Sequence, residues 1–77
     1  MNNTRRKALK KCINELERIS EELQRLYDEE EDYKENMPEN LQCSDRYEAS
    51  EEACNAMNEA IEHIDEAVSN IDNAVSA

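Results

Sequence analysis

The sequence has no glycine, no phenylalanine and no tryptophan, and its single proline is Pro38. Without glycine the chain lacks the phosphate-cradling loops, nucleophile elbows and tight hairpin turns of many enzymes and small β-proteins. No apolar run reaches the roughly 18–20 residues that cross a bilayer, and the start does not read as a secretory signal peptide. These absences favour a helical, non-membrane, cytoplasmic protein, and they argue against an enzyme.

Cysteine is scarce and irregularly spaced, at Cys12, Cys43 and Cys54. An odd number of thiols without an export signal predicts reduced cysteines rather than a disulfide framework. The gaps between them are too long for a C-x2-C zinc site, and the only histidine is His63. We therefore expect no metal or other cofactor, and we expect Cys12 and Cys54 to be small buried side chains.

Helix-forming residues with a seven-residue repeat make up most of the chain. In the first segment, apolar residues alternate three and four apart, which predicts a helix over about 4–36 with Thr4 as its N-cap. Pro38 interrupts the pattern, and Ser44 is expected to cap a second helix over about 45–75. Cys12 and Tyr33 belong to the same heptad positions as the expected core and oligomer seam, which consists of Leu9, Leu16, Ile19, Leu23, Leu26, Met57, Ile61, Ile64, Val68 and Ile71.

Two helices of nearly equal length joined by a linker over 37–44 predict one all-α domain, an antiparallel coiled-coil-like hairpin over residues 1–77. Facing residues are expected to have numbers that sum to about 84. This register places Glu30, the one acid in the seam, opposite Cys54. There it is expected either to form a polar layer with Ser50 and a tyrosine hydroxyl or to lie where the helices fray near the tip of the hairpin. Alanine also recurs every seven residues beside the second helix's seam, at Ala53, Ala60, Ala67 and Ala74.

The apolar stripes of both helices are three heptad positions wide, which is more than a single partner helix covers. A dimer or tetramer is therefore expected, with two hairpins forming a four-helix bundle. In such a bundle the basic end of one hairpin could meet the acidic end of another.

Charge is distributed unevenly along the chain. Five of the nine lysines and arginines lie in residues 5–11, whereas residues 12–77 carry all 20 acids against four bases, a net charge of −16. Both the basic start and the acidic end of the first helix oppose its dipole, and an antiparallel partner relieves this conflict. On the second helix we expect an exposed acidic face made of Glu48, Glu51, Glu52, Glu59, Glu62, Asp65 and Glu66.

A rod of closely spaced carboxylates imitates the charge of a nucleic-acid backbone. The expected function is a non-catalytic module that binds a basic groove on a nucleic-acid-handling or defence protein, without binding nucleic acid or membranes itself. One alternative is an oligomeric sponge that holds a small anionic, nucleotide-type signal on Arg5, Arg6 and Lys10 with tyrosines of another subunit. The other alternative is a structural or assembly subunit whose acids serve solubility.

The linker and its flanks read ENMPENLQCSDRYE over residues 35–48. This segment resembles the N-(M/L/I)-P-E-x-L-Q-x-S-x-R linker of a family of very short acidic helical-hairpin proteins encoded by bacteriophages and mobile elements. Tyr47 stands where many members have glycine. No activity is established for the family, so the resemblance implies a hairpin fold and a phage setting without catalytic residues. Inhibition of host machinery follows by analogy with other short acidic phage proteins.

Overall fold

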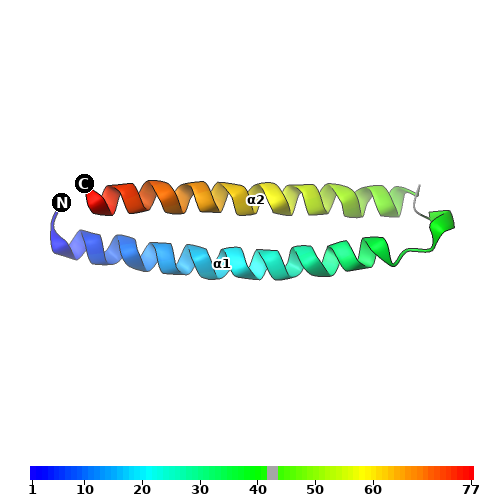
Figure 1. The fold of residues 1–77 in the computed structure, drawn as a ribbon, viewed down its shortest axis with the longest axis horizontal. Coiled ribbons are helices and arrows are strands. Elements are labelled where there is room, and N and C mark those ends of the chain that lie inside the picture. The colour runs from blue at the N-terminus through cyan, green and yellow to red at the C-terminus, as the bar shows by residue number, and fades with distance from the viewer. Residues whose placement is uncertain (42–43) are drawn as a thin grey trace.

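The computed structural model describes residues 1–41 and 44–77, and it consists of two long helices lying side by side (Figure 1). Helix α1 covers Asn3–Glu35, a 3-10 turn η1 covers Glu39–Leu41, and helix α2 covers Asp45–Ser76. The helices run antiparallel, with both termini at one end and the linker at the other. This confirms the all-α helical hairpin predicted from the sequence. Gln42 of the linker motif and the thiol of Cys43 lie outside the described residues.

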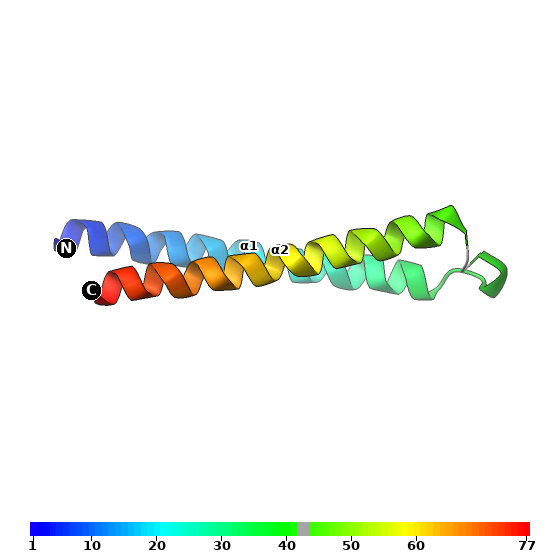
Figure 2. The same cartoon turned by 90° about the horizontal axis from the view of Figure 1, so that it is seen from above.

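The hairpin is a thin rod with Cα extents of 59 × 14 × 12 Å, and its two helices cross at a shallow angle when seen from above (Figure 2). Its radius of gyration is 17.5 Å, against about 11–12 Å for a compact domain of this length. The accessible surface is 5782 Å², roughly 900 Å² more than a compact 9.0 kDa protein exposes. Of the described residues, only Met37, Ser50 and Cys54 are buried.

Each helix begins at a residue whose side chain caps it. The Asn2 side-chain oxygen accepts a hydrogen bond of 2.8 Å from the Arg5 amide, so the prediction that Thr4 caps α1 is wrong. Asparagine is at least as good an N-cap as threonine, and using it adds Thr4 to the first turn. The Ser44 hydroxyl oxygen accepts from the Tyr47 amide at 3.3 Å, which confirms Ser44 as the cap of α2.

The chain leaves α1 at Asn36, whose amide donates to the Asp32 carbonyl oxygen at 3.0 Å. Pro38 cannot continue the helix because it lacks an amide hydrogen. Its carbonyl oxygen instead accepts from the Leu41 amide at 2.8 Å, which closes η1. The Met37 side chain is buried beneath this turn, so the linker end of the hairpin has a small apolar core.

The register of the two helices is fixed by contacts at both ends. Near the termini, the Arg6 Nε lies 3.2 Å from the Val75 carbonyl oxygen. Near the linker, the Lys34 Nζ lies 6.0 Å from the centre of the Tyr47 ring. The residue numbers of both pairs sum to 81, within one helical turn of the expected sum of about 84.

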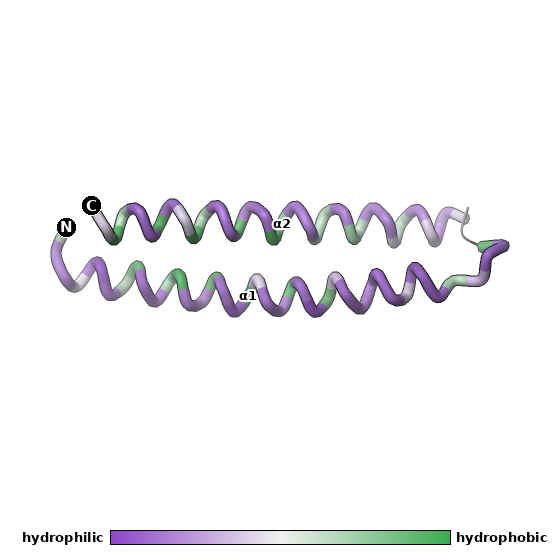
Figure 3. Tube along the Cα trace, in the orientation of Figure 1, coloured by the Kyte–Doolittle hydropathy of each residue, from purple (hydrophilic) through white to green (hydrophobic). Residues whose placement is uncertain are grey.

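The side of α1 that faces α2 differs from the prediction. Apolar residues recur along the inner edges of both helices (Figure 3), and on α1 the more protected positions are Arg6, Leu9, Ile13, Leu16, Ser20, Leu23, Tyr27, Glu30, Glu31 and Lys34. The other predicted line remains exposed: Ile19 is 41% accessible, Leu26 38% and Tyr33 48%. Cys12 is exposed as well, so its expected burial is wrong.

The physical reason is the width of the apolar stripe on α1. The line through Leu9, Leu16 and Leu23 has apolar neighbours on both sides, and one helix can cover only one of those sides. Helix α2 covers the side of Ile13 and Tyr27 and leaves the other side open. On α2 the expected seam positions Met57, Ile61, Ile64, Val68 and Ile71 are all half-buried.

Candidate interaction surfaces

The acidic face of α2 consists of Glu48, Glu51, Glu52, Glu59, Glu62, Asp65 and Glu66, all of which are exposed. No lysine or arginine follows Arg46 in the sequence. Seven carboxylates between Glu48 and Glu66 give about one per 4 Å along the helix axis. One strand of DNA carries a phosphate about every 3.4 Å, and the duplex carries one about every 1.7 Å. The acidic face therefore approaches the charge density of a single strand.

On α1, by contrast, acids are partly neutralised by arginine. The Arg25 guanidinium contacts Glu22 at 2.5 Å and Glu29 at 2.7 Å. Its hydrogen bond and its charge lower the pKa of Glu22. On α2 the one cationic partner of an acid is His63, whose Nδ1 lies 4.0 Å from Glu66 and which carries charge only when protonated. The strong negative field therefore belongs to α2.

The basic start of α1 is attached in part to the end of α2. The Arg6 guanidinium donates to the carbonyl oxygens of Val75 and Ala77, at 3.2 and 3.0 Å. Cations at a helix C-terminus satisfy its free carbonyl groups and interact favourably with the negative end of its dipole. Within residues 1–41 and 44–77, no ion pair joins this segment to the acids of α2. Arg5 and Lys10 are exposed, and the length of the rod separates all three from the tyrosines near the linker.

A polar cluster lies within the seam near the linker. The Lys34 Nζ lies 3.4 Å from a Glu31 carboxylate oxygen and 6.0 Å from the centre of the Tyr47 ring, over its face. Cys54 is 2% accessible, and its thiol has a raised pKa, first because it is buried and then because of Glu31. The Ser50 hydroxyl is buried nearby without a hydrogen-bond partner. The predicted polar layer of Glu30, Ser50 and a tyrosine hydroxyl is therefore not formed.

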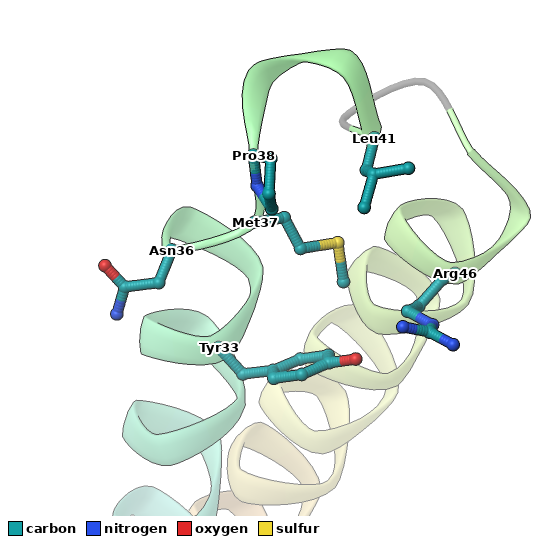
Figure 4. A pocket seen from close by; sticks show the side chains of 6 residues that line it. All are labelled: Tyr33, Asn36, Met37, Pro38, Leu41 and Arg46. Atoms are coloured by element: carbon teal, nitrogen blue, oxygen red, sulfur yellow. The ribbon is translucent and has the colours of Figure 1, made fainter.

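A small hollow opens at the linker end, where Tyr33 of α1 reaches across towards Arg46 of α2 (Figure 4). Its volume is about 330 Å³, and Asn36, Met37, Pro38 and Leu41 complete the lining. The Tyr33 ring and the guanidinium are both exposed, so an aromatic surface and a positive charge lie side by side. The linker motif includes Arg46, but sequence patterns gave no indication that it lies beside Tyr33, because the two become neighbours only after the linker folds back.

One side of the hairpin is apolar along most of its length, and we call it the open face. From α1 it contains Cys12, Ile19, Leu26 and Tyr33, the α1 apolar line. From α2 it contains Ala53, Ala60, Ala67 and Ala74, the alanine line, whose members are already half-buried within the hairpin. Arg46 lies one heptad before Ala53, so the hollow shared by Tyr33 and Arg46 shows that both lines point to the same side of the hairpin.

No group of three or more potential metal ligands occurs within the described ranges 1–41 and 44–77. In the same part of the chain, neither helix is apolar over a stretch long enough to cross a bilayer. Comparison with known proteins finds no matching family model, no similar curated protein and no similar solved structure. Inferences about function therefore start from the acidic face, the linker hollow and the open face.

Proposed function

We propose that the hairpin is a non-catalytic protein-binding module whose acidic face binds a basic groove on a nucleic-acid-handling or defence protein. In this proposal it acts as an inhibitor encoded by a phage or a mobile element. The observation that supports it is the exposed row of seven carboxylates on α2, a helix with no lysine or arginine after Arg46.

Rigidity adds to the effect of charge. The carboxylates project from one helix of 32 residues, so their spacing is set before binding and little backbone entropy is lost on association. A field of one sign steers a basic partner and speeds the encounter, and the benefit falls as salt screens it. A groove that holds a nucleic-acid strand already presents cations at a similar spacing.

The test is competition for such a groove. Immobilised wild-type protein is incubated with bacterial lysate, and captured proteins are quantified at low and high salt with and without added DNA. We expect them to be known nucleic-acid binders that DNA displaces. The matched variant carries Glu51→Gln, Glu62→Gln and Asp65→Asn, three exposed positions away from the open face.

The variant should retain its helical circular dichroism and lose most of the capture. Folding should change little, because removing exposed like charges costs little and relieves repulsion. Equal capture by the variant, or capture that excess DNA does not reduce, would contradict the proposal. Such a result would leave an assembly subunit as the better account.

The linker hollow supports a second candidate function, the sequestering of a small nucleotide-type anion. Tyr33 offers a ring on which a base can stack, and Arg46 offers a guanidinium for a phosphate. Calorimetric titration with mononucleotides and cyclic dinucleotides tests this function. Binding that Arg46→Gln abolishes, and that the triple acidic variant retains, would favour the sponge over the acidic module.

A further inference from the structure

We infer that a second copy of the chain covers the open face, with the two-fold axis parallel to the long axis of the hairpin. Helix α1 of each copy then packs against α2 of its partner, and both linkers lie at the same end of an antiparallel four-helix bundle. This arrangement does not depend on the identity of any other partner, so it goes beyond the proposed function.

The shape of the hairpin leaves it with surface to bury. Its whole accessible surface exceeds that of a compact protein of the same mass by roughly 900 Å², and a stable interface buries about 800 Å² per partner. The opposite side of the hairpin carries polar residues, among them Glu17, Gln24, Asn58 and Asp65. Because each hairpin has a single apolar face, two copies bury each other's face and leave none for a third copy, so assembly stops at a dimer.

Side-chain size selects the parallel axis. An axis along the rod keeps the level of each residue, so partner residues face each other in the same register as the two helices of one hairpin. The three large residues of the α1 apolar line then meet small residues of the partner's alanine line. The pairs are Ile19 with Ala67, Leu26 with Ala60, and Tyr33 with Ala53, while the small Cys12 meets Ala74, the second residue of each pair being the partner's.

An axis perpendicular to the rod would place α1 against α1 and α2 against α2. Large residues would then face large ones on one side, and alanines would face alanines on the other. Such a bundle would be overpacked along one seam and would leave voids along the other, and both defects are destabilising.

Charge at the rim favours the same choice. In the common register Arg18 lies level with the partner's Glu66, and Arg25 lies level with the partner's Glu59. With the perpendicular axis, Glu15 would instead approach Glu29 of the other copy, and the two copies of Glu22 would meet at the centre. Opposite charges across an interface fix its register, whereas like charges oppose it.

The first experiment is sedimentation equilibrium of the whole chain from micromolar to millimolar concentration. We expect the wild type to reach about 18 kDa, twice its 9.0 kDa mass. Ile19→Gln with Leu26→Gln should remain near 9 kDa at concentrations where the wild type is dimeric. The matched control, Glu21→Gln with Asp28→Asn, changes exposed residues outside the open face and should dimerise like the wild type. A monomeric wild type throughout, or a dimeric double variant, overturns the inference.

The second experiment exchanges size between two facing positions. Ile19→Ala should weaken the dimer about tenfold or more by leaving a void, and Ala67→Ile should do so by a clash. The two substitutions together should restore the dissociation constant to within about threefold of the wild type, because the isoleucine side chain removed at position 19 is replaced by the one introduced at position 67 of the partner. If the increases in dissociation constant caused by the two single substitutions simply multiply in the double variant, the pairing of α1 with the partner's α2 is refuted. That result would favour the perpendicular axis.

Discussion

Replacing Ser50 by alanine should stabilise the protein, although the residue is one of the most buried in the hairpin. Its side chain is 4% accessible, and its hydroxyl has no hydrogen-bond partner. A buried hydroxyl that has lost water without gaining a partner costs about 1–3 kcal/mol. Alanine removes this cost and also has a higher helix propensity than serine, by about 0.5 kcal/mol.

Removing one oxygen from a packed position also loses contacts, which offsets part of the gain in the free energy of unfolding. We therefore expect Ser50→Ala to raise the free energy of unfolding by about 1–2 kcal/mol. The matched control is Ser69→Ala, in the same helix at an exposed position, where only the propensity gain of about 0.5 kcal/mol applies. The difference between the two variants, about 1 kcal/mol, measures the desolvation of the Ser50 hydroxyl.

Urea unfolding followed by helical circular dichroism, at one protein concentration for all variants, gives these free energies. In a thermal scan the difference corresponds to about 4–8 °C in Tm for a domain of this size. If Ser50→Ala destabilises the protein, or gains no more than Ser69→Ala, the hydroxyl is satisfied in solution. The backbone carbonyl one turn earlier would then be its acceptor.

Three further predictions concern single contacts. The pKa of Cys54 is raised in the folded protein. The stability that this thiol contributes is therefore complete below its ordinary pKa, about 8.5, and is lost as the pH rises through the folded pKa. Cys54→Ala should make the free energy of unfolding, measured in urea, fall less steeply with alkaline pH. Arg6→Ala should lower the free energy of unfolding by about 1 kcal/mol through loss of its carbonyl contacts, while Lys10→Ala should change it by less than about 0.5. Met37→Ala should cost about 2–3 kcal/mol because Met37 is buried, whereas Leu41→Ala, at an exposed position, should cost less than about 1 in the same assay.

The helices and their register follow from strong local signals. No glycine interrupts either segment, Pro38 is the only breaker, and Ser44 is a good cap placed directly before an acid. The antiparallel register then follows from the short linker between helices of equal length. These are properties of neighbouring residues, which is why the sequence alone was enough to predict them.

The side of α1 that α2 covers could not be read in the same way. The α1 apolar line is more hydrophobic than the line that contains Ile13 and Tyr27, because the second line also includes Ser20 and Lys34. In the hairpin these polar residues are tolerated at half-buried positions, and the Lys34 ammonium lies beside Glu31 and over the Tyr47 ring. The apolar stripe is wide enough to offer either side of α1 to α2, and periodicity carries no information on which of the two is covered.

The orientation of the dimer also bears on how the chain can act. With both linkers at one end, the cations of residues 5–11 stay at least about 24 Å along the axis from the tyrosines of either copy, since 16 residues separate Lys11 from Tyr27. An anion site that combines Arg5, Arg6 and Lys10 with tyrosines of another subunit needs the perpendicular axis instead. Under the parallel axis Glu51, Glu62 and Asp65 lie away from the covered face on each copy. The bundle then presents two separate acidic surfaces, so the size-exchange experiment also discriminates between a bivalent acidic binder and a sponge built on the basic helix starts.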